Sequence, residues 1–188
     1  LLDGDRIIVL LAKLMQHFVA QLGELSAEET PNVGVVQTAY ANGASTFYIR
    51  KELGLQVVCT ATGVKFLHPA AHAMDLGIYF EANGHGTALL SSKFNALLAS
   101  KAATVPAACG ALTAVGDVLS QCCGDAIGDL LACELALHAL GWSFADWTKC
   151  YADLPSVQLK ATVPDPSVIT NNPDQTQALT PAGLQDKI

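Results

Sequence analysis

The sequence predicts an α/β fold, a three-layer α/β/α domain with a mixed sheet of about four to five strands, a helix-rich second half and an extended C-terminal tail. Short β-branched runs alternate with helical segments in the first half, which is typical of βαβ units. Residues 93–140 are rich in alanine and leucine, which favours helices. Proline and asparagine gather after residue 163, which favours a linker or tail.

The first half is expected to begin with a helix and then to alternate strands with helices. Asp3 is the predicted N-cap, and apolar residues recur at helical spacing until Gly23 ends the helix. Apolar and β-branched runs predict four strands, at residues 32–37, 56–60, 76–81 and 87–90. The last of these is expected to pair with the third as a hairpin. The connecting helices are expected at residues 43–53 and 63–74.

The second half is expected to be mostly helical over residues 93–140. Its breaks are predicted at residues that disfavour helix interiors, namely Pro106, Gly110 and Gly124. Ser143 is the expected cap of a further short helix that runs through Trp147. The second half therefore adds helices to the sheet of the first.

The C-terminal part is expected to add one strand and a tail. Residues 157–163 alternate apolar and polar side chains as a late edge strand does. Thr180 and Pro181 resemble the cap and the first position of a helix. The predicted division is a domain at residues 1–163 and a linker or tail at residues 164–188 that leads toward a further C-terminal domain.

The N-terminal apolar run does not predict a signal peptide or a membrane anchor. Residues 7–15 lack a preceding basic region and contain Lys13. No run reaches the roughly eighteen apolar residues that a spanning helix needs. The chain begins with Leu1 rather than methionine, inside an expected helix, so we expect sequence upstream of it.

Composition and charge limit the classes of partner. The chain has 188 residues, with ten Lys and Arg against seventeen Asp and Glu and a net charge of −7. So acidic a surface is unsuited to the phosphate backbone, which argues against a nucleic-acid partner. The six cysteines include an adjacent pair and no CxxC spacing. They are interpreted as buried, reduced thiols of a cytoplasmic protein.

Polar loops follow three of the expected strands, where ligands bind in open α/β sheets. These loops begin near Thr38, Thr60 and Glu81. The third, Glu81-Ala82-Asn83-Gly84-His85-Gly86, is the densest cluster of functional groups. A carboxylate and an amide two residues apart suit the two hydroxyls of a vicinal diol. In the second loop, Lys65 at a helix start can add a positive charge for a phosphate or a proton for an oxygen. The third loop is therefore the predicted site for sugar hydroxyls.

Each of these features also has a simpler structural interpretation. A Gly-His-Gly sequence is commonly a turn, and a lysine such as Lys65 is commonly a solvated helix residue. His68 and His72 have the spacing of metal ligands, but Pro69 lies between them and no third ligand is evident. Two aspartate-containing segments, residues 124–129 and 3–6, resemble acidic metal loops. Both are better explained as helix starts, so no metal site is predicted.

The loops belong to longer motifs that carry a resemblance to a known family. The runs are VGVVQTAYANGAST (33–46), TGVKFLH (62–68), DLGIYFEANGHGTALL (75–90), GDAIGDLL (124–131), YADLPSVQLKATV (151–163) and LTPAGLQ (179–185). Together they resemble the phosphoacetylglucosamine mutases of the α-D-phosphohexomutase superfamily. The resemblance covers nearly the whole chain and is weakest over residues 92–123.

The resemblance implies a specific part of a larger enzyme. Members have four domains around one cleft, and this chain is similar to the third, which recognises the sugar. Glu81, Ala82 and Asn83 match substrate-binding positions, with Glu81 and Asn83 expected on sugar hydroxyls. Lys65 matches a lysine of the cleft, and His85 and Gly63 complete the expected substrate-binding set. No catalytic residue and no metal ligand is expected in this chain.

The implied reaction interconverts N-acetylglucosamine 6-phosphate and 1-phosphate on the route to UDP-N-acetylglucosamine. Mg²⁺ is the implied cofactor, and a glucose or N-acetylglucosamine bisphosphate is the implied activator or intermediate. The phosphoserine, metal and phosphate-binding loops are expected in flanking domains, so the chain alone is expected to be inactive. The alternative is a stand-alone sugar-phosphate-binding module. A dinucleotide-binding oxidoreductase is disfavoured because no GxGxxG turn follows the first strand.

Overall fold

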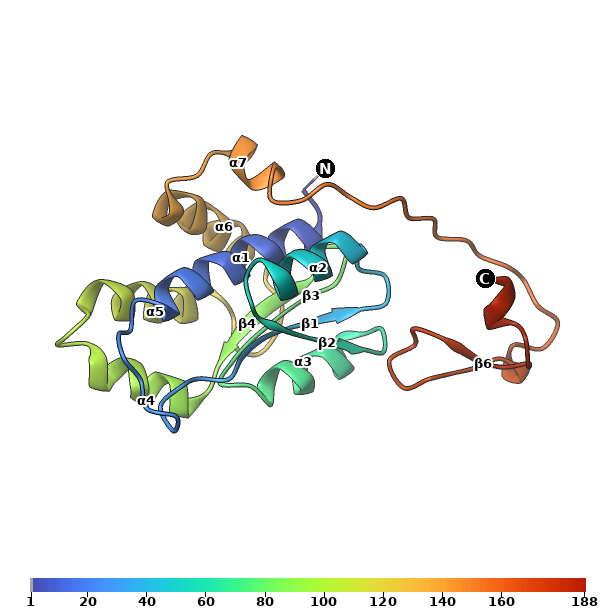
Figure 1. The fold of residues 1–188 in the computed structure, drawn as a ribbon, viewed down its shortest axis with the longest axis horizontal. Coiled ribbons are helices and arrows are strands. Elements are labelled where there is room, and N and C mark those ends of the chain that lie inside the picture. Colours follow the sequence, from blue (N-terminus) through green and yellow to red (C-terminus); the bar gives the residue numbers. More distant parts are fainter. Residues whose placement is uncertain (1) are drawn as a thin grey trace.

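A computed structural model describes residues 2–188 and shows a four-stranded mixed sheet between two layers of helices (Figure 1). The strand order is β2-β1-β3-β4, with β1 parallel to both β2 and β3 and with β3 antiparallel to β4. The strands are β1 (Val33–Thr38), β2 (Gln56–Thr60), β3 (Leu76–Phe80) and β4 (Gly86–Leu90). The predicted three-layer fold is confirmed, with four strands in its sheet.

Opposite crossover directions place helices on both faces of the sheet. Helix α2 (Gly43–Lys51) connects β1 to β2, and α3 (Val64–His72) carries the chain back past β1 to β3. Because both crossovers are expected to be right-handed, connections that run in opposite directions lie on opposite faces. Helix α1 (Gly4–Val19) shares a face with α2, and α3 covers the other face (Figure 1).

The core follows this division into two faces. Successive strand residues point to opposite sides, so Val35 packs with the α1 cluster while Val36 packs with α3. The α3 side is close-packed because Gly77 faces the backbone of Ala71, where a Cβ atom would overlap it. The larger cluster gathers apolar side chains of α1 with the helices of the second half. Each fully buried aliphatic side chain contributes about 1.5–3 kcal/mol to stability.

The second half is mostly helical, as expected, but one of its predicted breaks is absent. Its helices are α4 (Ser92–Lys101), α5 (Pro106–Val118), α6 (Ala126–Leu140) and α7 (Phe144–Thr148). The predicted break at Gly110 is wrong, because α5 continues through it. A glycine in a helix interior costs only about 1 kcal/mol, which the packing of neighbouring residues outweighs. Ser143 caps α7 in a capping box with Asp146.

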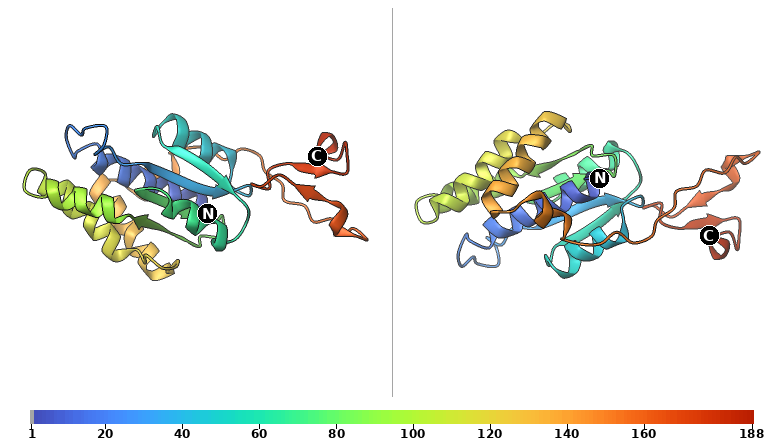
Figure 2. Two further views of the ribbon diagram at one scale, coloured as in Figure 1. Left: turned by 90° about the horizontal axis from the view of Figure 1, so that it is seen from below. Right: turned by 90° about the horizontal axis from the view of Figure 1, so that it is seen from above.

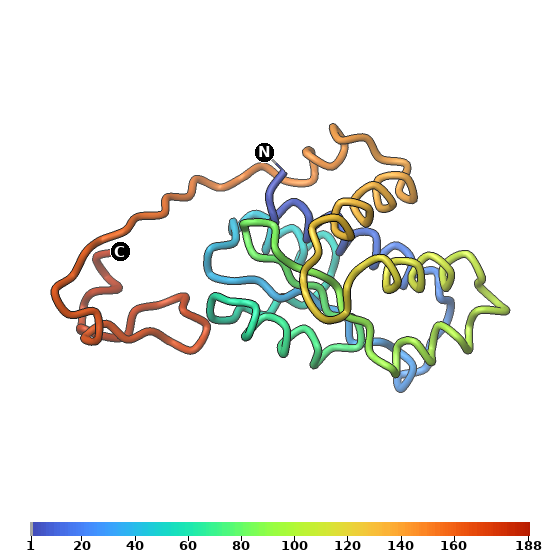
Figure 3. Tube along the Cα trace, turned by 180° about the vertical axis from the view of Figure 1, so that it is seen from behind, coloured from blue at the N-terminus to red at the C-terminus, as the bar shows by residue number. Residues whose placement is uncertain are grey.

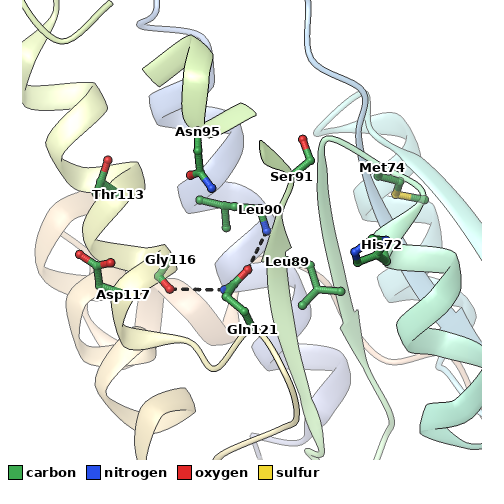
Figure 4. Close-up of a pocket in the computed structure, with 10 residues that line it drawn as sticks. All are labelled: His72, Met74, Leu89, Leu90, Ser91, Asn95, Thr113, Gly116, Asp117 and Gln121. Atoms are coloured by element: carbon green, nitrogen blue, oxygen red, sulfur yellow. Dashed lines mark hydrogen bonds between the residues drawn. The ribbon is translucent and has the colours of Figure 1, made fainter. Parts of the chain in front are cut away.

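The outer edge of β4 is covered by one side chain. The Gln121 amide accepts the Leu90 N–H at 2.9 Å (Figure 4) and donates to the Ala88 carbonyl at 3.0 Å, as a neighbouring strand would. It also donates to the carbonyls of Leu119 and Gly116. An unpaired strand edge is a site of self-association, and this amide closes it. The pocket of about 200 Å³ in Figure 4 lies beside this contact.

Replacing Gln121 by leucine is expected to lower the free energy of unfolding by about 1–2 kcal/mol, because it leaves the paired β4 groups without partners. The variant is also expected to self-associate through the opened edge. Urea unfolding and sedimentation velocity measure the two effects. Gln21→Leu, at an exposed position after α1, is the matched control. Wild-type stability in Gln121→Leu would show that the amide does not support the edge.

The C-terminal segment leaves the body of the molecule and returns as a small hairpin (Figures 1 and 2). Residues 152–163 form no strand, so the predicted edge strand at 157–163 is wrong. Val157 and Leu159 are 78 % and 90 % exposed. The alternating pattern is real, but a strand needs a partner strand, and no strand pairs with this segment.

The hairpin consists of β5 (Thr170–Asn171) and β6 (Ala178–Thr180), with single 3₁₀ turns at Pro166–Val168 and Gln185–Lys187. The predicted helix start at Thr180 is wrong. Its hydroxyl donates to the Val168 carbonyl at 2.8 Å and accepts the Thr170 N–H at 3.0 Å. That hydroxyl therefore joins the hairpin and caps no helix. The division of the chain near residue 163 stays a prediction.

The cysteines are all free thiols. Cys109 and Cys133 are buried, as expected, and Cys59 and Cys150 are only half-buried. Cys122 and Cys123 are exposed, so the prediction of burial is wrong for that pair. The pair lies in the turn between α5 and α6, which the core does not cover. Among residues 2–188, no helix combines the length and the apolar character needed to cross a membrane.

Candidate functional site

A crevice lies where the carboxyl ends of β1, β2 and β3 meet. The connection after β1 leaves toward β2 and the connection after β3 leaves toward β4, so the two loops separate at this edge. The trace in Figure 3 shows both loops at the end of the body that faces the C-terminal hairpin. The lining of this pocket, of about 250 Å³, is Thr38, Tyr40, Thr62, Glu81, Ala82, Asn83 and Gln158. Three of the predicted site residues, Glu81, Ala82 and Asn83, are thus brought together.

Three internal hydrogen bonds shape residues 81–86, which we call the sugar loop after the role predicted from the sequence. The Glu81 N–H donates to the His85 carbonyl, and the Gly84 N–H donates to the Glu81 carbonyl, both at 2.9 Å. The His85 N–H donates to the Asn83 Oδ1 atom at 2.9 Å. Gly84 has a φ of +92°, which a residue with a side chain rarely adopts. Because the Asn83 oxygen is engaged, its Nδ2 group is the part available to donate to a ligand.

The start of α1 supports the sugar loop from behind. The Gly4 N–H donates to the Ala82 carbonyl at 3.1 Å. A Cβ atom on Gly4 would overlap the Glu81 carbonyl oxygen and would lie 3.0 Å from the Gly84 nitrogen. Only glycine therefore permits this close approach, and the helix start holds the backbone that carries Glu81 and Asn83.

The other predicted site residues do not line the pocket. The His85 ring lies against Gly124 in the turn before α6. The two are so close that a Cβ atom added to Gly124 would be 2.7 Å from the Cε1 atom of His85. Lys65 is exposed on the first turn of α3, with its Nζ atom 4.9 Å from the centre of the Phe66 ring. Gly63, with a φ of +116°, begins that helix. The binding roles of these three residues stay predictions.

Gln158 is a pocket residue that the sequence reasoning missed, because its segment was interpreted as a strand. It reaches the crevice through residues 148–154, which buried Arg6 anchors. The Arg6 guanidinium donates to the Tyr151 carbonyl at 2.9 Å and forms an ion pair with Asp153 at 2.8 Å. No local sequence signal could have revealed this arrangement, since the contacting residues are more than 140 positions apart.

The Asp3–Arg6 segment is a helix start, as the sequence favoured. Asp3 caps α1 by accepting the Arg6 N–H at 3.2 Å. Asp5 accepts the Asn42 N–H at 2.7 Å, and burial raises the pKa of this carboxyl to about 6. Asn42 in turn donates to the Leu154 carbonyl at 2.9 Å. Residues 2–188 contain no cluster of three side chains suited to a metal ion.

The chemistry of the crevice suits sugar hydroxyls better than phosphate. Its lining combines one carboxylate with hydroxyl and amide side chains, and none of the described lining residues is a lysine or arginine. The Glu81 carboxylate accepts hydrogen bonds, and the Asn83 amide donates them. A vicinal diol can therefore be held between the two, while a phosphate group would meet a negative charge.

Comparison with known proteins shows the family of this chain. Residues 3–142 match the family model described as phosphoacetylglucosamine mutase AMG1, domain III. The phosphoacetylglucosamine mutase of Arabidopsis thaliana is 45 % identical across the whole chain, which spans 35 % of that relative's length. An Aspergillus fumigatus N-acetylphosphoglucosamine mutase solved with GlcNAc-6P and magnesium aligns with a TM-score of 0.93 and 41 % identity, over the whole chain and 35 % of that protein.

A variant of the A. fumigatus enzyme, solved with glucose 1,6-bisphosphate, aligns with a TM-score of 0.86 and 41 % identity. The alignment again includes the whole of this chain and 35 % of that protein. The chain thus spans about a third of the length of the relatives that it matches. The fold, the sugar loop and the family match lead to one assignment. The chain belongs to the phosphoacetylglucosamine mutase family and corresponds to its domain III.

Proposed function

We propose that this chain recognises the sugar in a phosphoacetylglucosamine mutase that interconverts N-acetylglucosamine 6-phosphate and 1-phosphate. The observation that carries the proposal is the placement of Glu81 and Asn83 together in one crevice, on a loop buttressed by Gly4. The Glu81 carboxylate accepts from one sugar hydroxyl, and the Asn83 Nδ2 group donates to its neighbour. Thr38 and Tyr40 supply further hydroxyl groups at the same wall.

The reaction requires a site that tolerates two orientations of the sugar. Phosphoryl transfer at either end proceeds through a bisphosphorylated sugar, so each end must face the reacting group in turn. Contacts to the 3- and 4-hydroxyls suit this demand, because those groups lie between the two phosphorylated positions. The lining carries no cation among the described residues, so both phosphate positions stay outside the pocket.

Magnesium, which accompanies one solved relative, does not fit the residues of this chain. Asp3 is engaged as a helix cap, and Asp5 is buried against the Asn42 N–H. We therefore place the metal and the phosphate-binding groups in flanking domains of the same polypeptide. The proposed enzyme works in the cytoplasm, on the route to UDP-N-acetylglucosamine. Glu81, Ala82 and Asn83 are the proposed substrate-binding residues, with His85, Gly63 and Lys65 as outer members of the set.

A titration of the isotopically labelled chain tests this proposal. N-acetylglucosamine and its 6-phosphate are expected to shift the backbone amide signals of residues 81–86. Their affinities are expected to be similar and millimolar, because the pocket binds the sugar hydroxyls and not the phosphate. Inorganic phosphate is expected to leave these signals unchanged. No shift with either sugar at tens of millimolar would contradict the proposal. Micromolar affinity for the 6-phosphate would instead favour a stand-alone sugar-phosphate-binding module.

A further inference from the structure

A second pocket, of about 410 Å³, lies between the start of α1 and helices α6 and α7. Most of its wall is apolar, formed by Leu2, Ile7, Leu130, Leu137, Phe144 and Trp147. The rings of Phe144 and Trp147 stack with their centroids 6.2 Å apart, so the wall includes an aromatic face. Two carboxyl residues, Asp129 and Glu134, also line the pocket, as does Gly84 of the sugar loop. The pocket shares none of the residues that line the crevice.

Asp129 is a buried carboxyl without a complete set of partners. It is 5 % exposed, and its Oδ1 atom has no hydrogen-bond partner among the described residues. Asp125, one turn earlier, is the helix cap and accepts the Ile127 N–H at 3.1 Å. Burial, together with the Asp125 charge, raises the pKa of Asp129 to about 7. Such a carboxyl is costly in the fold unless something donates to it.

The charges around this pocket are negative. Glu134 lies on the same helix as Asp129, and no lysine or arginine among the described residues lines the pocket. Arg6 at the start of α1 directs its guanidinium to Asp153 and Tyr151 instead. The Cys133 thiol, also in the lining, has its pKa raised to about 12 by burial and is neutral. The wall therefore offers negative charge and an aromatic surface, with no cation to balance them.

We infer that this pocket binds an organic cation, an ammonium, amidinium or guanidinium group on an apolar body. The cationic group pairs with Asp129, and the apolar body lies against Leu130 and the Phe144–Trp147 stack. Charge complementarity supports the cationic group, and burial of apolar surface against the apolar and aromatic wall supports the body of the ligand. The volume suits a small organic molecule, since ligand pockets commonly measure about 300–1,000 Å³.

Occupation of this pocket would also reach the sugar loop. Gly84 lines the pocket, and its N–H donates to the Glu81 carbonyl at 2.9 Å. A ligand in the pocket thus contacts the back of the loop that carries Glu81. The Gly84 amide signal is accordingly a direct reporter of binding.

Benzamidine is a suitable probe because it joins a phenyl ring to an amidinium. Titrated into the labelled chain at pH 8, it is expected to shift the signals of Gly84, Asp129 and Cys133 and to bind at least tenfold more tightly than neutral benzamide. Benzoate, with the opposite charge, is expected not to bind. Affinity for benzamidine is expected to rise about tenfold from pH 6 to pH 8, because the carboxylate form of Asp129 becomes dominant over that range.

Two variants distinguish the effect of the pocket charge on binding from any effect on folding. Asp129→Asn, nearly isosteric, is expected to lose at least tenfold in benzamidine affinity and to lose the pH dependence, while its thermal melt shows a folded chain. Glu134→Gln is expected to lose only a few-fold, because its carboxyl is not fully buried. Equal binding of benzamidine and benzamide, or unchanged benzamidine binding by folded Asp129→Asn, would overturn the inference.

Discussion

Replacing Glu81 by alanine is expected to lower kcat/KM by about 10²-fold or more in a full-length mutase that carries this chain as its domain III. Among the described residues, the carboxylate is the only negative charge in the lining of the crevice. Its loss leaves a sugar hydroxyl without an acceptor and frees the sugar to turn away from the reacting phosphate. A loss of 10²-fold corresponds to about 2.7 kcal/mol of transition-state stabilisation. Steady-state kinetics with N-acetylglucosamine 6-phosphate provide the measurement.

Two further variants show whether the effect belongs to the carboxylate. Glu81→Gln keeps the shape and one acceptor oxygen, so its expected loss is intermediate. Glu24→Ala removes an exposed carboxylate beyond the end of α1 and is expected to retain wild-type kinetics. Activity of Glu81→Ala within a few-fold of wild type would contradict the assignment of this residue to the sugar.

Gly4→Ala is expected to have an effect of similar size without touching the substrate. The added methyl group would overlap the Glu81 carbonyl oxygen, and the backbone on both sides of this contact is held by the hydrogen bonds from Gly4 and Gly84. The loop must move away from α1, and a displacement of about 1 Å at a positioning group costs about 10²-fold in rate. The overpacking is also expected to lower the free energy of unfolding by about 1–3 kcal/mol. Kinetics of the full-length enzyme and urea unfolding of the chain measure the two effects.

Gly110→Ala is the matched control for this substitution. Gly110 lies inside α5, and a Cβ atom there meets nothing within 4 Å. The same chemical change is therefore expected to raise the free energy of unfolding by up to about 1 kcal/mol and to leave the kinetics unchanged. If Gly4→Ala matched this control in both measurements, the close contact between α1 and the sugar loop would have no functional role.

Local sequence patterns predicted most of the core elements. Asp3, Ser143 and Asp125 each cap a helix where a cap was expected, because capping depends only on residues within one turn. The central strands β1 and β3 were predictable because they are buried on both faces of the sheet, which favours apolar and β-branched runs. The alternating pattern at residues 157–163 failed to predict a strand, because alternation describes a side-chain arrangement and cannot supply a partner strand.

The candidate site was predicted in part for a similar reason. Glu81 and Asn83 are two residues apart after a buried strand, so their proximity to each other and to the sheet edge is a local property. Gln158 enters the same pocket only because Arg6 and Asn42 anchor the segment before it. The direction of the His85 ring depends on the space left by Gly124, which is 39 positions away.

The sequence by itself determined the α/β class, the family of this chain and the loop that carries its polar groups. Each of these can be recognised from motifs that are contiguous runs of residues. Only the tertiary structure decided which loop residues face the crevice. It also showed that Gly4 must be glycine, and that Asp129 lies buried beside an aromatic wall. These are properties of the space between segments distant in the chain, and packing forms that space only when the chain folds.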